Sequence, residues 1–174
     1  MGTSSNDADR QIMIRPAMPD DIGEVRKLLV ATWHDTYDSL LGVERVTETT
    51  NQWHALDVLA TQAAHPNASF LVASQGGKMV GHTFAVEQDG DVLLLSRLYV
   101  LPTRQRQGIG GGLLRASVQR HPGTTRVQLA VEARNTNALA FYGRHGFVVT
   151  GEVDEEEPRP LRMEVAVAKW QLGR

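Results

Sequence analysis

The chain contains no cysteine, and this single absence removes several classes of chemistry. Without a thiol there is no disulfide, no thiolate nucleophile and no cysteine-ligated zinc. Histidine occurs six times, but never in a close metal-ligand spacing such as His-Glu-x-x-His. We therefore expect no metal site and no covalent thiol intermediate, and the composition is typical of a cytoplasmic protein.

Long apolar runs and an excess of basic charge are missing as well. The 18 Lys and Arg residues are outnumbered by 20 Asp and Glu residues, whereas a nucleic-acid-binding domain usually carries a broad basic face. No segment has the length of a transmembrane helix, and the opening MGTSSNDADR lacks the apolar run of a signal peptide. We expect no nucleic-acid or membrane partner, a flexible tail over residues 1–10 and one domain over residues 11–174.

The first third of the chain alternates between the strand period and the helix period. A short strand over residues 12–16 is followed by a helix, at whose start Asp21 and Glu24 have the spacing of a capping box. A second helical stretch covers residues 53–59. Two helices therefore precede the next strand.

Three strand-like segments then run from residue 69 to residue 101, separated by the hairpin signals QGGK and QDGD. A glycine-rich loop, a helix, a strand and a helix closed by Gly146 precede two last strands. The predicted order is β-α-α-β-β-β-α-β-α-β-β, an α/β (α+β) fold with a mixed sheet. The final strand alternates apolar residues over 161–167, so it could pair with a second subunit in a homodimer.

The helix after the third of these strands begins with four glycines, Gly108, Gly110, Gly111 and Gly112. Each costs about 1 kcal/mol relative to alanine inside a helix, so a benefit must offset the loss. A helix N-terminus offers unpaired N–H groups and a positive dipole end, and glycine removes side chains that would hold an anion away. The basic neighbours Arg104 and Arg106 favour an anion site over a simple tight turn.

The spacing decides between phosphate-binding templates. A dinucleotide fingerprint needs glycine where Leu113 stands, and a Walker A loop needs a lysine that is absent. The segment Gln105 to Gly110 fits Gln/Arg-x-x-Gly-x-Gly/Ala and resembles the acyl-CoA pyrophosphate loop of the GNAT superfamily of N-acetyltransferases. LYVLP, LAVEARNTNALAFYGRHGF and IRPAMPDD resemble that family's fourth strand, its following strand and helix, and its first strand. The resemblance runs from about residue 12 to residue 168.

The resemblance implies that acetyl-CoA is the cosubstrate. Backbone groups at the end of the fourth strand, here Leu98, Tyr99 and Val100, would hold the pantetheine arm and the acetyl carbonyl. Asn135, with Ala138 three residues on, would contact the pantetheine arm or the end of the cofactor. The loop residues expected to hold the pyrophosphate are Gln105, Arg106, Gln107, Gly108, Gly110 and Gly111. Arg106 stands where many relatives have glycine, and Gln107 where many have Lys or Arg.

Tyr142 lies where the family often places its general acid, and we also expect it to contact the cofactor. It would return a proton to the departing CoA thiolate. Transfer from a phenol with a pKa near 10 to a thiolate with a pKa near 8.5 is uphill by about 2 kcal/mol, so solvent must restore the balance. Packing in the core is the alternative role for this residue.

The general base is not apparent from the sequence. Relatives often carry a glutamate four residues before the leucine that matches Leu98, but this chain has Leu94 there. Glu87, Glu132, His82 or a chain of water molecules could replace it, although each of these residues is more often a solvated strand residue.

Trp33 and Tyr37, four residues apart on one helical face, fall where the family forms a wall of the acceptor pocket. They and Glu87 are the candidate substrate-binding residues, although an aromatic pair at this spacing is more often core. The acidic run over residues 154–157 could attract a cationic substrate or could simply be solvated.

Together these features predict acetyl transfer from acetyl-CoA to a primary amine of a small molecule or peptide. Direct attack in a ternary complex is expected, since no cysteine can carry the acetyl group. One alternative is a CoA-binding sensor or scaffold module of the same fold without turnover. Others are a binding domain for a different nucleotide and an acyltransferase for longer acyl groups. The acceptor, the acyl length and the oligomeric state stay open.

Overall fold

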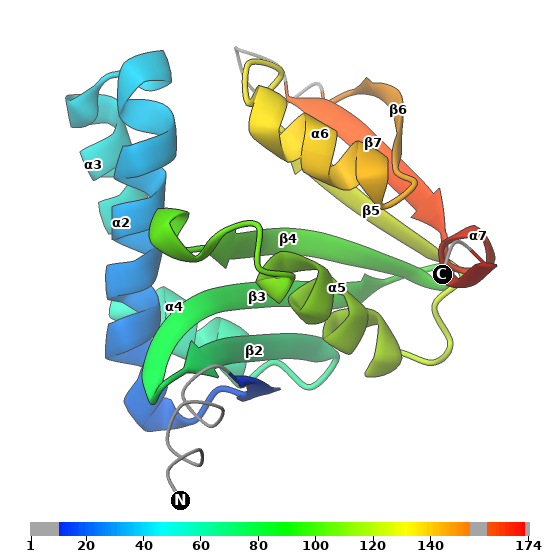
Figure 1. Ribbon diagram of the computed structural model, residues 1–174, viewed down its shortest axis with the longest axis horizontal. Coiled ribbons are helices and arrows are strands. Elements are labelled where there is room, and N and C mark those ends of the chain that lie inside the picture. The colour runs from blue at the N-terminus through cyan, green and yellow to red at the C-terminus, as the bar shows by residue number, and fades with distance from the viewer. Residues whose placement is uncertain (1–10, 154–159, 173–174) are drawn as a thin grey trace, which may run out of the picture. The chain divides into compact units, whose positions relative to one another are not determined.

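The computed structural model describes residues 11–153 and 160–172. Its strands form a seven-stranded sheet with the hydrogen-bonded order β1-β2-β3-β4-β5-β7-β6 (Figure 1). Parallel and antiparallel pairs both occur, which confirms the predicted mixed-sheet fold class. The strands are β1 Ile12–Pro16, β2 Ala68–Gln75, β3 Lys78–Gln88, β4 Val92–Val100, β5 Arg126–Val131, β6 Val148–Glu152 and β7 Leu161–Ala166. The predicted N-terminal tail and the acidic run lie outside the described residues.

Three α-helices, not two, lie between β1 and β2. The predicted helical stretch over residues 53–59 is divided, because one helix ends at Trp53 and the next begins at Leu56. The α-helices are α2 Ile22–Leu41, α3 Val43–Trp53, α4 Leu56–Ala63, α5 Ile109–Gln119, α6 Thr136–Arg144 and α7 Val167–Leu172; the 3-10 turns are η1 Pro19–Asp21 and η2 Pro102–Arg104. Apolar residues continue at helical spacing through the break between the two helices, so the sequence pattern did not indicate it.

The chain divides into two compact units, which are described separately. The first unit comprises Met1–Phe84 and Arg97–Ser117, and the second comprises Ala85–Ser96 and Val118–Arg174. Both β3 and β4 contribute residues to each unit. The single domain expected over residues 11–174 stays a prediction.

Helices cover both faces of the strands in the first unit. Figure 1 shows α5 in front of β2 and β3, with α4 behind them. Ile109 and Leu113 of α5 are almost fully buried against Leu71 and Val80. On the helical side, α2 packs against α3 and α4, and α4 against β2. Burial of these apolar side chains is the main stabilising contribution to the unit.

Two tight turns connect β2 to β3 and β3 to β4. Gly76 and Gly77 have φ values of 57° and 73°, so both central residues of the first turn are left-handed, as a type I′ hairpin requires. In the second turn Gly90 and Asp91 have φ values of 77° and 57°. The hairpin predictions are therefore confirmed, although the left-handed pair of the second turn lies one residue later than the Asp-Gly dipeptide.

The predicted capping box at the start of α2 is wrong. The Asp21 carboxylate accepts two hydrogen bonds from the Arg15 guanidinium, at 2.6 and 3.0 Å, and one from the Met18 N–H at 2.7 Å. Asp21 makes no side-chain hydrogen bond to the N-terminus of α2. The charged partner on β1 competes better for the carboxylate than a neutral amide does, and it holds the pKa of Asp21 below its usual value.

The second unit is built around β5, β7 and β6. β7 pairs antiparallel with β5 on one edge and with β6 on the other, where a bulge lies between Val149 and Gly151. The final strand therefore has no free edge, so the expected pairing of this strand with a second subunit is wrong. The strand also ends earlier than predicted: Val167 begins α7, and its N–H donates to the Thr125 carbonyl at 2.8 Å.

Candidate active site

Strands β4 and β5 pair over only a short stretch. Their parallel ladder comprises three residue pairs, from Val92–Arg126 to Leu94–Gln128. Each strand continues beyond it, β4 to Val100 and β5 to Val131. The predicted cofactor residues Leu98, Tyr99 and Val100 therefore stand on a strand end that is outside this ladder, where backbone groups can serve a ligand.

The loop Gln105–Gly108 connects η2 to α5 and is exposed along its whole length. Gly108 has a φ of 82°, and a Cβ added there would meet open space, so its backbone conformation is what requires glycine. The α5 helix begins at the next residue. The loop thus delivers the free N–H groups of a helix N-terminus to solvent without a side chain at Gly108.

Arg106 is held in the left-handed region, with a φ of 61°. A side chain in this conformation costs roughly 1–2 kcal/mol relative to glycine. This chain therefore keeps an arginine there in spite of backbone strain. Strained residues of this kind gather at ligand sites.

Not all four glycines share one cause. A Cβ on Gly112 would lie 3.0 Å from the Ile14 Cδ1 atom, so this glycine lets α5 approach β1 closely. Its N–H already donates to the Gly108 carbonyl at 2.9 Å. Gly112, which was not among the predicted pyrophosphate contacts, thus has a packing role.

Side chains of the loop anchor it to the first unit. The Gln105 Nε2 atom donates to the Val100 carbonyl at 3.2 Å, and Arg104 donates to Gln75 Oε1 at 3.3 Å. Leu101 N–H donates to the Val80 carbonyl at 2.9 Å. The end of β4 and the loop are thus held together by hydrogen bonds rather than by sequence proximity alone.

The second unit carries Asn135, Ala138 and Tyr142. Asn135 is the N-cap of α6, and its Oδ1 atom accepts from the Ala138 N–H at 3.1 Å, which gives the Asn-x-x-Ala spacing a local structural role. Tyr142 is 9% exposed and lies edge-on to Phe141 and Phe147, with ring centroids 5.2 and 5.4 Å away. Both residues fit a structural role, and their cofactor roles stay predictions.

The candidate acceptor residues Trp33 and Tyr37 form a buried aromatic cluster in the first unit. Their ring centroids are 4.8 Å apart, and Trp33 lies 6.5 Å from Tyr99. Trp53 adds a half-exposed ring 5.6 Å from Trp33, with 45% of its surface exposed. Trp53 was not among the predicted site residues, because its helical spacing gave no sign that this ring would be exposed beside the cluster.

His82 is not the solvated strand residue that its sequence context indicated. It is fully buried, and its Nδ1–H donates to the Leu71 carbonyl at 2.9 Å. Burial, assisted by the charge of Arg97, lowers the pKa of His82 well below its usual value. A neutral imidazole whose protonation is so disfavoured makes a poor general base for an amine at neutral pH.

The two candidate carboxylates already have partners. The Glu87 carboxylate accepts from His121 Nδ1 at 2.9 Å, and the Glu132 carboxylate accepts from Arg134 Nε at 2.9 Å.

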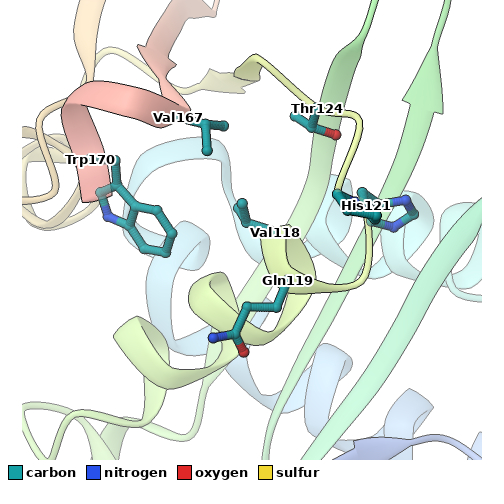
Figure 2. A pocket seen from close by; sticks show the side chains of 7 residues that line it. Val118, Gln119, His121, Thr124, Val167 and Trp170 are labelled. Atoms are coloured by element: carbon teal, nitrogen blue, oxygen red, sulfur yellow. The ribbon is translucent and has the colours of Figure 1, made fainter. Parts of the chain in front are cut away.

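A separate hollow of about 490 Å³ lies within the second unit (Figure 2). Trp170 and Val167 of α7 face the end of α5 across it, and Figure 2 shows the His121 ring directed away from Trp170. The residues that line it come from these helices and the connection to β5, namely Val118, Gln119, His121, Pro122, Thr124, Val167 and Trp170. None of the predicted site residues lines this hollow.

The model of the acetyltransferase (GNAT) family matches residues 28–147, which is more than half of the chain. The chain belongs to the GNAT acetyltransferase family. A probable N-acetyltransferase of Mycobacterium tuberculosis is 25% identical over 160 residues, covering 84% of this chain and 86% of the relative. A peptidyl-lysine N-acetyltransferase of Escherichia coli is 32% identical over 97 residues, covering 56% of this chain and 62% of the relative.

The fold of this acetyltransferase is also found among solved structures. The PaiA N-acetyltransferase of Thermoplasma acidophilum, solved in complex with coenzyme A, superimposes with a TM-score of 0.80 at 20% identity, covering 90% of this chain and 99% of that one. Within the described residues no helix is long and apolar enough to cross a membrane. The same residues contain no group of three or more side chains placed to hold a metal ion.

Proposed function

We propose that this protein transfers an acetyl group from acetyl-CoA to a primary amine by direct attack in a ternary complex. The exposed loop Gln105–Gly108 carries the proposal, because a left-handed Gly108 with open space around it stands at the start of α5. A backbone cradle of this kind fits a pyrophosphate better than a side-chain nucleophile or a metal. Membership in the acetyltransferase family supports the same cosubstrate.

The residues of the chain would divide the binding work. Loop N–H groups from Gln105 to Gly111 would hold the pyrophosphate, with Arg106 adding positive charge. Backbone groups of Leu98 to Val100 would hold the pantetheine arm and polarise the acetyl carbonyl, and Asn135 would contact the arm. Acetyl-CoA supplies an activated thioester, so catalysis would arise mainly from placing the amine beside it.

Three proton movements accompany the reaction. The attacking amine, with a pKa near 10.4 for a lysine side chain, must first lose a proton. The environments described above leave Glu87, Glu132 or water for this step rather than His82. The nitrogen would then bond to the acetyl carbon, the carbon–sulfur bond would break, and Tyr142 would give its proton to the departing thiolate. The acylated nitrogen would release its second proton to solvent, and solvent would return a proton to Tyr142.

Replacement of Tyr142 by phenylalanine tests the assignment of the acid. We expect kcat of Tyr142→Phe to fall about 100-fold, with the Kd for acetyl-CoA within about twofold of wild type because the ring is retained. Titration calorimetry with acetyl-CoA, longer acyl-CoAs and ATP would measure binding, and thiol release would measure turnover over a panel of small amines and lysine peptides.

The matched control is Phe141→Leu, which disturbs the ring that contacts Tyr142 without removing a hydroxyl. Its kcat should change far less than that of Tyr142→Phe. Equal losses of binding and turnover in Tyr142→Phe would leave Tyr142 with a packing role only.

A CoA-binding sensor of the same fold is the second candidate. The observation in its favour is that Leu94 occupies the position of the expected base, while the carboxylates of Glu87 and Glu132 are already paired. This function predicts acetyl-CoA binding in the calorimeter with no thiol release on any amine of the panel. Turnover on one class of amine would exclude it and would identify the acceptor class.

A further inference from the structure

Arg97 of β4 is a buried cation in the first unit. The side chain is 8% exposed, and no carboxylate of the described residues forms a salt bridge with it. Its terminal nitrogen donates to Gln62 Oε1, whereas its Nε–H has no hydrogen-bond partner. Burial lowers the pKa of Arg97 to about 10, so the guanidinium remains charged at neutral pH.

Two aromatic rings partly replace the missing counter-ion. The guanidinium carbon lies 4.9 Å from the centroid of Phe84 and 5.8 Å from that of Phe70. Cation–π contacts of desolvated groups contribute about 2 kcal/mol or more each. The two rings therefore offset part of the several kcal/mol that removal of an ion from water costs, but they leave the Arg97 Nε–H without a hydrogen-bond partner.

Three further buried side chains with unsatisfied nitrogen atoms accompany Arg97. Trp33 Nε1, both ring nitrogens of His54, and His82 Nε2 have no hydrogen-bond partner. The Trp33 and His54 rings lie 5.5 Å apart, and Phe70 contacts His82 at 4.3 Å as well as Arg97. We call Trp33, His54, His82 and Arg97 the Arg97 group.

The formal charge of the Arg97 group is +1. Burial lowers the pKa of His54 to about 4, and the charges of Arg97 and Arg26 act in the same direction, so His54 is neutral at pH 7. His82 is neutral too, and because its Nδ1–H faces a carbonyl, its Nε2 carries a lone pair. Unsatisfied donors are therefore Arg97 Nε–H, Trp33 Nε1–H and one N–H of His54.

A buried donor without a partner costs about 1–3 kcal/mol, and native proteins rarely leave several in one place. One negative charge would compensate the guanidinium and accept hydrogen bonds from these donors. Water would satisfy the donors but not the charge. A dianion would leave excess negative charge in the same apolar surroundings.

We propose that the Arg97 group binds one small monoanion of the carboxylate or halide type. Trp33, His54 and Arg97 supply the hydrogen bonds, and Arg97 supplies the charge. The anion comes either free from solution or as the carboxylate of an acceptor amine. The second source rests on the proposed function, and the first does not.

Thermal denaturation of the full-length protein in sodium formate tests the site. A ligand that binds only the folded state raises Tm, and we expect a rise of about 3 °C or more between 0 and 100 mM formate. Arg97→Met, which keeps the bulk without the charge, should lose this rise. Arg26→Gln is the matched control, because it removes a half-buried charge that also acts on His54, and its rise should equal that of wild type. Equal rises in wild type and Arg97→Met would overturn the proposal.

Two measurements keep the test decisive if Arg97→Met does not fold. Trp33→Phe removes one donor and keeps an aromatic ring, so its formate response should be smaller than that of wild type; an unchanged response would contradict the assignment of that donor. Wild-type crystals soaked in sodium bromide should show an anomalous peak beside Arg97 Nε. Absence of this peak together with an unchanged Tm in formate would exclude the site.

A pair of amines distinguishes the two sources of the anion. Glycine and glycinamide differ in the carboxylate and present the same aminomethyl group. At least a tenfold preference for glycine in kcat/KM that vanishes in Arg97→Met would identify the acceptor as the source. Equal rates would identify a free anion. No turnover on any amine would reject the proposed function, while the formate and bromide results would still decide the anion site.

Discussion

The loop Gln105–Gly108 and the Arg97 group, both in the first unit, are two different kinds of proposed anion-binding site. The loop residues are contiguous and exposed, and they act mainly through backbone N–H groups. The members of the Arg97 group come from α2, β3, β4 and the residue after α3, and they act through buried side chains. A site made of backbone groups can therefore be predicted from a short sequence motif. A site made of side chains from four separate segments of the chain cannot.

The two regions also differ in what their charges require. Arg104 and Arg106 are exposed, so water and salt screen them. Arg97 is removed from water, and its surroundings must supply rings, an amide and an anion in compensation. The same residue type thus tunes affinity at the surface and determines stability in the interior.

The largest expected effect is a loss of folding stability at acidic pH, which should arise from the Arg97 group and not from the loop. The pKa of His54 is about 4 in the folded protein, against 6.5 in the unfolded chain. The contribution of neutral His54 to the free energy of unfolding is complete above pH 6.5. It is lost as the pH falls towards 4, because His54 of the unfolded chain takes up a proton at a higher pH than His54 of the folded protein. We expect the free energy of unfolding to fall by about 3 kcal/mol from His54 alone, and His82 should add to this loss. Urea denaturation between pH 7.5 and pH 4.5 would measure it.

His54→Gln should flatten this pH dependence, since glutamine cannot take up a proton. The matched control His65→Gln removes an exposed imidazole of the same unit and should leave the curve parallel to that of wild type. Identical curves for wild type and His54→Gln would show that the Arg97 group does not control acid stability.

A smaller effect is expected at the loop. Gly108→Ala places a side chain at a φ of 82°, which costs about 1–2 kcal/mol. The loop can relieve this strain only by leaving the cradle conformation, so the Kd for acetyl-CoA should rise about tenfold. Titration calorimetry would measure it, with Gly23→Ala in α2 as control, because a Cβ there also meets open space. An unchanged Kd for Gly108→Ala would show that the loop backbone does not hold the cofactor.

The smallest expected effect is an increase in stability together with a decrease in acetyl-CoA affinity. Arg106→Gly relieves the left-handed strain at φ 61°, so the free energy of unfolding should increase by about 1 kcal/mol. It also removes a positive charge, so acetyl-CoA should bind several-fold more weakly, and the difference should shrink at high salt. Greater stability with unchanged affinity would mean that the arginine is only tolerated.

Several elements were predictable because a local rule determined them. Gly76–Gly77 requires a type I′ turn, and Gly146, with a φ of 82°, follows α6 and ends it as its position indicated. Alternation over β1 and the helical spacing of α2 were also read correctly. The loop Gln105–Gly108 belongs to this class, since its conformation depends on glycine rather than on distant partners.

Other features depend on competition between partners and could not be predicted. The Asp21 carboxylate could accept a hydrogen bond from an α2 amide or from the Arg15 guanidinium. It binds the guanidinium, because the fold places this charged and stronger donor beside it. Gly112 is explained only when Ile14 of β1 is placed beside it. The interior position of β7 likewise follows from pairing with β5 and β6, which apolar alternation does not specify.

The amino-acid sequence by itself determined the family and the loop, because both depend on residue identity at fixed local spacing, and its composition shows that no cysteine side chain is present. Only the tertiary structure decided which residues leave water. Burial turned His82 from an apparent surface residue into a neutral core histidine, and it left Arg97 as a cation without a carboxylate partner among the described residues. The desolvation of a group depends on all the residues that pack around it, so it cannot be predicted from a short stretch of sequence.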